Sequence, residues 1–506
     1  MSTKIYSATI IGLDAEPIEV EACSTYGMSN FFLVGLADTE VKEARERVRA
    51  AMRHSNLPFP RGRIIVNLAP ARVKKQGTHF DVPIALSLLA NLGELKLTHS
   101  EQTQFMGELG LDGTIRPVTG VLVATLSAKQ RGFKHIFVPA ANAQEAALVK
   151  DIEIYPAAHL NDLVRHFSGE QPIESIQPVE LNFANLNYDT DMSMVRGQEF
   201  VKRALEIAAA GAHNILFTGP PGSGKTLLAK TVPSILPDLT MDEALEVFKI
   251  YSVAGLIGSE DSIICTRPFR HPHHSASSVS IVGGGSWPKP GEVSLAHRGV
   301  LFMDEFPEFP RSVLETLRQP LEDGQITVAR AAGTFQFPAK FMLVAAMNPC
   351  PCGYATDPDK QCVCSPRRVI EYRKKISGPL LDRIDIVIEV PKVKTESLIG
   401  THTSEASAKV RERVQAARDR QLDRLRQNKI FTNSEMGSRL IEKHCALDEA
   451  GTDLIRRAIN SKHLSARAYT RTLKIARTIA DLEGQNQITP VHLSEALNYR
   501  PQFIHT

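Results

Sequence analysis

Residues 219–226 read Gly-Pro-Pro-Gly-Ser-Gly-Lys-Thr, directly after the apolar run 215–217 and directly before a helical pattern. This strand–loop–helix context is the one that a phosphate-binding loop requires. Small residues allow backbone N–H groups to converge on a triphosphate, and the N-terminus of the following helix adds its positive dipole end. The motif predicts an ATP or GTP site made of Gly219, Pro220, Pro221, Gly222, Ser223, Gly224, Lys225 and Thr226.

Two side chains of this loop have defined tasks in nucleotide chemistry. Lys225 can reach the β- and γ-phosphates, and the Thr226 hydroxyl can hold a magnesium ion. Phosphoryl transfer also needs a second magnesium ligand and a group that orients the attacking water. Residues 299–306, Gly-Val-Leu-Phe-Met-Asp-Glu-Phe, form an apolar run ending in two acids, which is typical of a strand buried on both faces. We therefore expect Asp304 to support the magnesium ion and Glu305 to orient the water.

Three further segments follow in an order that suits the same chemistry. The apolar run 341–347 ends in Asn348, an amide placed where a group that senses the γ-phosphate would lie. Residues 378–385, Gly-Pro-Leu-Leu-Asp-Arg-Ile-Asp, precede another apolar run at 386–390. Residues 465–471, Ser-Ala-Arg-Ala-Tyr-Thr-Arg, open a long amphipathic helix. Buried strands that alternate with helices indicate an α/β fold with a parallel sheet.

Taken in this order, the motifs resemble those of an AAA+ ATPase, most closely the branch that holds magnesium-chelatase subunits and MCM helicases. The resemblance implies a P-loop core with a parallel sheet and a helical lid. It also implies that Asn348 is sensor 1, that Arg383 is the arginine finger given to a neighbouring subunit, and that Arg467 is sensor 2. Arg471, one helical turn further along the same face, is the alternative for the sensor-2 role.

Unusual segments narrow the resemblance to one family. Residues 267–275 (Arg-Pro-Phe-Arg-His-Pro-His-His-Ser), 291–299 (Gly-Glu-Val-Ser-Leu-Ala-His-Arg-Gly) and 348–354 (Asn-Pro-Cys-Pro-Cys-Gly-Tyr) look like signatures of the chelatase-like group. Essentially all 506 residues resemble the YifB/ComM family, whose best-known member is a competence-associated branch-migration helicase.

The family resemblance implies a function and its partners. It suggests an ATP-driven hexamer acting on single-stranded and branched DNA, as a helicase or branch-migration motor in recombination or natural transformation. A magnesium-chelatase-type motor or a protein-remodelling ATPase is the alternative. The chelatase alternative is weakened because a chelatase motor subunit would begin close to its P-loop, whereas this chain has a whole domain before it.

The chain divides into four expected parts. Residues 1–168 resemble the Lon-protease-type α+β domain found at the start of the family. Residues 169–192 are polar and are interpreted as a linker. Residues 193–394 form the AAA+ core, and residues 395–506 form the helical lid. In the first part, a helix capped near Asp38 or Thr39 is expected to bury Val41, Ala44, Val48 and Met52.

The first part lacks the catalytic groups of a Lon peptidase. Matching the Lon pattern onto residues 75–81 puts His79 at the nucleophile position, and matching it onto 119–122 puts Leu122 at the lysine position. No Ser–Lys pair is then present to activate a nucleophile. We expect this domain to be a catalytically inactive scaffold.

Two insertions in the core are candidates for contact with DNA. Residues 283–288, Gly-Gly-Gly-Ser-Trp-Pro, suggest a loop or hairpin, and residues 325–337 suggest a hairpin that turns at 331–333. In ring ATPases of the type that the sequence resembles, such insertions face the central pore. Lys289 and Arg330 are therefore candidates for phosphate contacts, although either could equally be a solvated loop charge.

Two clusters contain residue types that bind metals. Two Cys-x-Cys pairs, separated by nine residues, comprise Cys350, Cys352, Cys362 and Cys364. Four thiolates this close suit a structural zinc ion, and reduced cysteines in a loop are the alternative. The second cluster is His271, His273 and His274, for which satisfied or pore-lining histidines are favoured over metal ligands.

Composition and charge are those of an ordinary globular protein, 43% hydrophobic and 23% charged. The net charge of +3 is small, but residues 401–506 contain 18 Lys and Arg against 12 Asp and Glu, which permits a polyanionic partner. No apolar stretch approaches the roughly 18 residues that span a bilayer, and no signal-peptide core is present, so no membrane partner is expected. Seven cysteines, an odd number, make a disulfide framework unlikely, so we expect a cytoplasmic protein.

Overall fold

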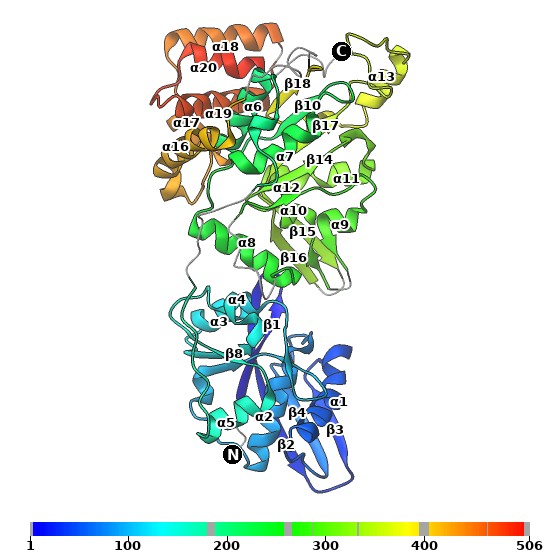
Figure 1. Ribbon diagram of the computed structural model, residues 1–506, viewed down its shortest axis with the longest axis vertical. Helices are drawn as coiled ribbons and strands as arrows, with labels where there is room; N and C mark the ends of the chain where they lie inside the picture. Colours follow the sequence, from blue (N-terminus) through cyan, green and yellow to red (C-terminus); the bar gives the residue numbers. More distant parts are fainter. Residues whose placement is uncertain are drawn as a thin grey trace. The chain divides into compact units, whose positions relative to one another are not determined.

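The computed structural model describes residues 4–179, 188–257, 266–285, 287–330, 333–393, 404–462 and 464–499. The chain packs as two units (Figure 1). The first contains Met1–Asn182 together with Ala244–Ile264, and the second contains Phe183–Glu243 together with Cys265–Thr506. The domain bounds expected from the sequence stay predictions. The boundary at 394/395 and residues 180–187 of the expected linker lie outside the described residues.

A seven-stranded mixed sheet forms the centre of the first unit. Its strands are β1 (Ile5–Ile11), β2 (Asp14–Thr25), β3 (Asn30–Val34), β4 (Arg63–Ala69), β5 (Thr103–Phe105), β8 (His135–Pro139) and β9 (Glu153–Ala157). They lie in the order β3-β4-β2-β1-β5-β8-β9, and a separate pair joins β6 (Glu108–Leu109) to β7 (Ile115–Arg116). The β1–β2 and β2–β4 pairs are antiparallel, whereas the remaining pairs of the large sheet are parallel.

The first unit contains helices, and a side-chain cap sets the start of the longest of them, α1. They are α1 (Thr39–His54), α2 (Asp81–Leu92), α3 (Val121–Gln130), α4 (Ala143–Ala146) and α5 (Leu160–Ser168). Asp38 caps α1 by accepting a hydrogen bond of 2.9 Å from the Val41 backbone N–H. The predicted helix and its buried face are confirmed, since α1 buries Val41, Ala44, Val48 and Met52.

The segment Ala244–Ile264 packs with the first unit although it follows the P-loop in sequence. It includes most of α8 (Met241–Ala254), whose Ser252 accepts a backbone hydrogen bond of 3.0 Å from Gly120. The Ser252 hydroxyl donates to the buried carboxylate of Glu145, which also accepts from the Leu122 backbone at 3.0 Å. Burial raises the pKa of Glu145, and these hydrogen bonds oppose the rise.

A five-stranded parallel sheet forms the centre of the second unit, as the sequence predicts. Its strands are β10 (Ile215–Thr218), β11 (Phe269–Arg270), β14 (Val300–Met303), β17 (Met342–Met347) and β18 (Ile386–Glu389), in the order β11-β14-β17-β10-β18. Central residues such as Phe217, Phe302 and Val344 are fully buried, because helices cover the sheet on both faces. All five strands run the same way, so their carboxyl ends share one edge and their amino ends share the opposite edge.

Helices of the core and lid surround this sheet (Figure 1). The core helices are α6 (Glu199–Gly211), α7 (Lys225–Ile235), α9 (Ser278–Val282), α10 (Glu292–Leu295), α11 (Arg311–Thr316), α12 (Arg318–Asp323), α13 (Pro366–Arg373) and α14 (Gly378–Leu381). The lid helices are α16 (Ser407–Leu425), α17 (Ser438–His444), α18 (Glu449–Lys462), α19 (Ala466–Leu482) and α20 (Pro490–Asn498). Buried Arg418 of α16 joins lid to core by donating to the Ala209 and Ala210 carbonyls at the end of α6.

Two short hairpins extend from the core. One pairs β12 (Gly283–Gly284) with β13 (Lys289–Pro290), and the other pairs β15 (Gln325–Arg330) with β16 (Gly333–Pro338). The second confirms the predicted hairpin, although residues 331–332 of its turn lie outside the described residues. None of the helices in the described part of the chain combines the length and apolar character that crossing a bilayer requires.

Candidate functional site

The carboxyl edge of the parallel sheet gathers the predicted phosphate-binding and catalytic residues. The P-loop follows β10, Asp304 follows β14, and Asn348 follows β17. β10 lies next to β17, which lies next to β14, so the three chain segments leave the sheet side by side. This is the position at which open α/β sheets bind ligands.

Lys225 is the first residue of α7 and is almost fully buried. Its ammonium group donates to the Gly219 and Pro220 carbonyls, each at 2.8 Å, and approaches the Asn348 amide oxygen at 3.3 Å. Burial lowers the pKa of Lys225, and the charge of Asp304 opposes that effect. Lys225 therefore lies within the loop that is expected to hold phosphate, and its ammonium group is next to Asn348, the predicted sensor.

Thr226 and Asp304 are joined directly, as expected of two groups that share a magnesium ion. The Thr226 hydroxyl donates to one Asp304 oxygen at 2.7 Å. The other Asp304 oxygen accepts from the Glu305 backbone N–H at 2.9 Å. Glu305 has a left-handed backbone, with φ at 50°, which is uncommon for a residue with a side chain and costs on the order of 1 kcal/mol.

The loop has the shape that a triphosphate requires. Gly222 and Gly224 have φ of 75° and 88°, a region in which residues with side chains are strained. A Cβ on Gly219 would lie 2.3 Å from the Val390 carbonyl oxygen, so only glycine fits there. The Ser223 hydroxyl is buried and has no hydrogen-bond partner among the described residues. These features fit ATP with Mg²⁺, for which Thr226 and Asp304 supply hard oxygen ligands.

Gln198 supports this loop and is a residue that the sequence did not reveal. It lies directly before α6, with φ at 57°. Its side-chain amide donates to the Ser223 carbonyl at 2.9 Å and to the Pro391 carbonyl at 2.8 Å, so it ties the P-loop to the end of β18. The preceding Gly197, with φ at 62°, is the one local signal of an unusual turn.

The predicted arginine finger and sensor-2 residues lie at the opposite, amino edge of the sheet. Arg383, Arg467, Arg471 and Lys474 line a cavity of about 520 Å³. The same cavity is lined by the residues that lead into the strands: Arg267, Gly299, Phe341, Asn214 and Asp385. The strand length of the sheet therefore separates these arginines from the P-loop of their own chain.

Acidic side chains hold the arginines in this cavity. Glu322, the penultimate residue of α12, forms ion pairs with both Arg383 and Arg467, the latter at 3.0 Å. Arg471 pairs with Asp385 at 3.4 Å. Arg383 is largely buried, and burial together with the neighbouring cations Arg467, Arg318 and Arg471 lowers its pKa. Its Nε atom lacks a hydrogen-bond partner in the described part of the chain.

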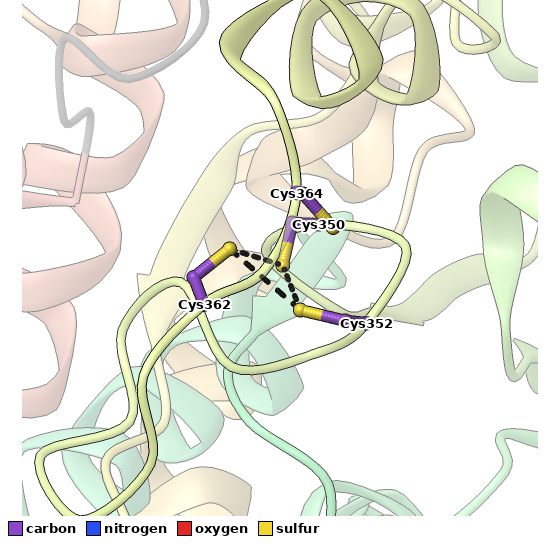
Figure 2. Close-up of side chains that lie close together, drawn as sticks. All are labelled: Cys350, Cys352, Cys362 and Cys364. Atoms are coloured by element: carbon purple, nitrogen blue, oxygen red, sulfur yellow. Dashed lines mark hydrogen bonds between the residues drawn. The ribbon is translucent and has the colours of Figure 1, made fainter.

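The four clustered cysteines have the spacing of a tetrahedral metal site. Their sulfur atoms all lie within 4.8 Å of one another. Figure 2 shows the contacts among Cys350, Cys352 and Cys362, whose sulfur atoms are 3.4, 3.6 and 3.7 Å apart, with Cys364 beside them. Thiolates about 2.3 Å from a zinc ion would lie about 3.8 Å from one another, so the donor set fits zinc.

Backbone N–H groups around the cysteines favour the thiolate form that binds a metal. The Tyr354 and Val363 N–H groups stabilise the thiolate of Cys352 and lower its pKa to about 6. The cysteine loop also packs on the P-loop, because a Cβ on Gly353 would lie 2.6 Å from the ring of Pro221. The cluster is therefore structurally continuous with the nucleotide site.

The three histidines of the segment 267–275 do not form such a metal cluster. Within the described ranges, the cysteines are the group of three or more His, Cys, Asp or Glu whose ligand atoms converge. His271 packs on Phe302 with ring centroids 4.6 Å apart, and burial lowers its pKa. His274 pairs with Glu305 at 3.0 Å.

The two candidate DNA contacts lie on neighbouring hairpins. Lys289 is paired with Gly284 in the β12–β13 hairpin, and Arg330 is paired with Gly333 in the β15–β16 hairpin. A Cβ on Gly284 would lie 3.1 Å from the Arg330 guanidinium, so the two hairpins touch. Both cationic side chains are exposed.

The positions that would carry a Lon dyad are both buried. His79 donates through Nε2 to the Ala8 carbonyl oxygen, at 2.6 Å, and burial lowers the pKa of His79 to about 4. Because a carbonyl oxygen only accepts, that nitrogen carries the proton. Leu122 is fully buried. The inactivity of this domain stays a prediction.

Three family models match the chain. The model described as magnesium chelatase, subunit ChlI, matches residues 191–398, and the model for subunit ChlI of Mg-chelatase matches residues 20–142. The model for the ChlI C-terminal region matches residues 404–500.

Two relatives match this chain over nearly the whole length of both proteins. The chain is 45% identical to the competence protein ComM of Haemophilus influenzae, over 98% of this chain and 97% of that protein. It is 41% identical to the YifB protein of Escherichia coli, over 98% of this chain and 96% of that protein. A Lon protease of Mycoplasma mycoides is 28% identical over 29% of this chain and 18% of its own length.

Proposed function

The chain belongs to the YifB/ComM family of magnesium-chelatase-like AAA+ ATPases, and from this membership we propose that it is an ATP-driven motor that acts on DNA. We propose that it works as a homo-hexamer, as a helicase or branch-migration factor in recombination or natural transformation. The similarity to ComM, a competence protein, supports a role in natural transformation. The cytoplasm is the compartment in which such a motor would meet DNA.

One observation carries the assembly part of this proposal. The P-loop lies at the carboxyl edge of the sheet, whereas Arg383, Arg467 and Arg471 lie around a cavity at the amino edge. A complete site needs cations against the transition-state charge. Apposing the amino edge of one subunit to the carboxyl edge of the next would supply them. Such head-to-tail contacts form a ring when the rotation between subunits closes, and a filament when it does not.

The residues of the carboxyl edge have distinct tasks in this proposal. Lys225 would exchange its bonds to the Gly219 and Pro220 carbonyls for phosphate oxygens. Thr226 and Asp304 would hold the magnesium ion, which neutralises phosphate charge when bound. Glu305 would orient the attacking water, and Asn348 would sense the γ-phosphate through its contact with Lys225.

DNA binding is supported by charge and by aromatic groups on the hairpins. Exposed Lys289 and Arg330 are candidates for phosphate contacts. Half-buried Trp287 lies against buried Phe335 of β16 with ring centroids 5.6 Å apart, and an aromatic ring beside cations suits single-stranded nucleic acid. The basic excess in residues 401–506 adds to the attraction for a polyanion.

We further propose that Cys350, Cys352, Cys362 and Cys364 bind one structural zinc ion. The convergent sulfur atoms support this assignment, and four protein ligands leave no position for water. Because the cysteine loop follows Asn348 and packs on Pro221, zinc would stiffen one wall of the nucleotide site.

Steady-state ATPase activity tests the proposed function. The purified protein is assayed without nucleic acid, with single-stranded DNA and with forked DNA, each at two salt concentrations. We expect DNA to stimulate turnover and the stimulation to fade as salt rises, because phosphate contacts release counterions. Turnover that is indifferent to every DNA would contradict the DNA motor.

A chelatase-type motor is the second candidate, because the matching family models are described as chelatase subunits. A protein-remodelling ATPase would likewise ignore DNA. Stimulation of ATPase activity by a tetrapyrrole-binding partner would identify the former, and stimulation by an unfolded polypeptide the latter.

A further inference from the structure

The part of the first unit that runs from the last two turns of α1 to the start of α2 is basic and contains no acid. Residues 47–80 include eight Lys and Arg and no Asp or Glu. Residues 22–37, which contain β3, have no charged side chain at all. β3 is the end strand of the large sheet and lies beside β4 (Figure 1). These two segments therefore bring positive charge, and no negative charge, to one edge of the sheet.

Aromatic rings hold two arginines at this edge. The Arg63 guanidinium lies over the Phe32 ring, 5.2 Å from its centroid, and the Arg49 guanidinium lies over the Phe59 ring at 5.8 Å. Phe59 stacks on Phe31 of β3, with ring centroids 6.3 Å apart, so the Arg49 side of α1 is joined to β3. A guanidinium that stacks on a ring retains its planar set of N–H donors for the oxygen atoms of a partner.

The exposed cations of this edge have no acidic partner. No carboxylate of the described residues forms an ion pair with any of four exposed arginines: Arg49, Arg53, Arg61 and Arg63. By contrast, Arg47 of α1 pairs with buried Asp81 at 2.6 Å. Surface cations without compensating acids attract a polyanion, because a chain of phosphates supplies the missing negative charge.

Exposed apolar side chains gather at the same place. Tyr26 follows the end of β2 and is fully exposed, and Met28 in the same turn is 91% exposed. This turn lies beside Arg63, because a Cβ on Gly27 would lie 4.0 Å from the Arg63 Cβ. Apolar groups that cluster in water mark an interaction site. An exposed ring beside arginines is the arrangement on which the bases of a single strand stack.

We propose that the β3 edge, which comprises β3, the turn at Tyr26 and the arginines around them, binds single-stranded DNA. Tyr26 stacks on a base, and Arg49, Arg61 and Arg63 contact phosphates. A single strand fits better than a duplex, because unpaired bases offer their faces to a side chain. The proposal rests on the proposed function for the identity of the partner, and it extends contact with that partner from the hairpins of the second unit to the first unit.

A second copy of this chain is the other occupant that an end strand admits. Within the described residues β3 pairs with β4 alone, so its outer main-chain groups are open to another strand. Two copies that met at this edge would bring their unpaired arginines together, and like charges disfavour such a contact. The charge of the edge therefore favours DNA.

Binding of fluorescein-labelled oligo(dT) to the full-length protein, without ATP and at several salt concentrations, tests the proposal. The reference protein contains Lys289→Ala and Arg330→Ala, which remove the contacts proposed for the second unit, and it should still bind oligo(dT). Adding Tyr26→Ala should weaken the affinity at least about fivefold, the lower end for loss of one stacked base. Tyr26→Phe keeps the ring and should bind like the reference.

The phosphate contacts are tested in the same reference protein. Arg61→Ala should weaken binding and lower the slope of log Kd against log salt by about 0.7, the change for one lost phosphate contact on a single strand. Arg131→Ala is the matched control, because it removes an exposed cation of the first unit that pairs with Glu16 at 2.9 Å, and it should leave the slope unchanged. Tyr26 and Arg61 are exposed, so neither substitution should change the melting temperature.

Three results would overturn the proposal: no oligo(dT) binding by the reference protein, unchanged affinity in Tyr26→Ala or Arg61→Ala, or an equal loss in Tyr26→Phe or Arg131→Ala. Unchanged affinity in Tyr26→Ala together with a changed oligomeric state in light scattering would identify the edge as a contact between copies instead. Failure of DNA to stimulate ATPase activity contradicts the motor, whereas this test measures binding without ATP, so the two failures are distinguishable.

Discussion

The carboxyl and amino edges of the parallel sheet carry two different sets of charged residues, to which we assign two halves of one reaction. At the carboxyl edge, Lys225, Asp304 and Asn348 converge around a glycine-rich loop with the geometry of a phosphate site. At the amino edge, Arg383 and Arg467 line a cavity and share one carboxylate, Glu322. The sheet separates the two sets within one chain. With the roles proposed above, each chain would hold two incomplete half-sites, and we propose that hydrolysis depends on assembly.

The two edges also differ in how their charges are neutralised. Lys225 is satisfied by neutral backbone carbonyls, which phosphate oxygens can replace without separating an ion pair. The arginines are held by Glu322 and Asp385, and an ion pair must break before either guanidinium meets phosphate. We therefore expect the amino edge to be the regulated half.

The largest expected effect comes from removing the amino-edge cation Arg383. Arg383→Ala should lower kcat about 1000-fold, the magnitude of a lost arginine finger, while ATP binding by the same chain persists. The control Arg318→Ala removes a nearby cation that pairs with Glu315 at 3.0 Å. Steady-state kinetics and analogue binding check both variants, and a kcat loss below about tenfold would contradict the finger assignment.

A comparable loss at the other edge should follow from Glu305→Gln. We expect turnover to fall at least about 100-fold, because the amide cannot accept the water proton, whereas ATP should still bind. Glu308→Gln, at a nearby acid that pairs with Lys375 at 3.0 Å, is the matched control. Normal hydrolysis by Glu305→Gln would show that another group activates the water.

At the amino edge, substitution of Arg467 should affect catalysis, whereas substitution of Arg471 should affect the stability of the fold. Exposed Arg467 has the solvent access of a group that meets a partner's nucleotide, so Arg467→Ala should lower kcat about tenfold at unchanged thermal stability. Arg471 pairs with nearly buried Asp385, so Arg471→Ala should destabilise the fold by about 3 kcal/mol. Denaturant unfolding and ATPase assays distinguish the two, and exchanged phenotypes would make Arg471 sensor 2.

The loss of folding stability caused by Arg471→Ala should depend on pH. Burial opposes ionisation of Asp385, but Arg471 and His213 outweigh it and lower its folded pKa below the usual 3.8. Ionised Asp385 therefore stabilises the fold above about pH 4, and this contribution is lost as the pH falls through the lower folded pKa. The stability difference between parent and Arg471→Ala should accordingly shrink in acid.

The smallest effect on turnover is expected from the cysteine cluster. Cys352→Ser should release zinc and lower the melting temperature, while kcat falls only a few-fold, because the loop supports Pro221 without touching phosphate. Cys445→Ser, at a buried cysteine of the lid, is a control that should keep the zinc content. Purified parent protein free of zinc, with unchanged stability on adding it, would contradict the site.

Motifs that combine a strand end with a polar residue were predictable, because parallel strands bring their carboxyl ends together whatever the loops between them. Lys225, Thr226, Asp304 and Asn348 meet for this reason. The helix capped by Asp38 could also be predicted from the sequence, because its cap and its buried face are local features. The convergence of the cysteines followed from short spacing.

Contacts between segments that lie far apart along the chain could not be predicted from the sequence. β11 has only two residues, Phe269–Arg270, too few for any periodic pattern, so the contact of His274 with Glu305 could not be foreseen. The pairing of Glu322 with Arg383 and Arg467 joins two helices and a turn that lie far apart in sequence. Residues 244–264 gave no signal that they pack with the first unit, because their partners Gly120 and Glu145 precede the P-loop.

Subunit mixing tests most directly whether the two edges complete each other between chains. Glu305→Gln and Arg383→Ala are each purified, shown to be nearly inactive, and combined in equal amounts under conditions of subunit exchange. A site between the intact carboxyl edge of Arg383→Ala and the intact amino edge of Glu305→Gln contains every catalytic group, so the mixture should recover substantial ATPase activity. Mixed assemblies, verified by differently tagged subunits, that stay as inactive as either variant alone would contradict the account.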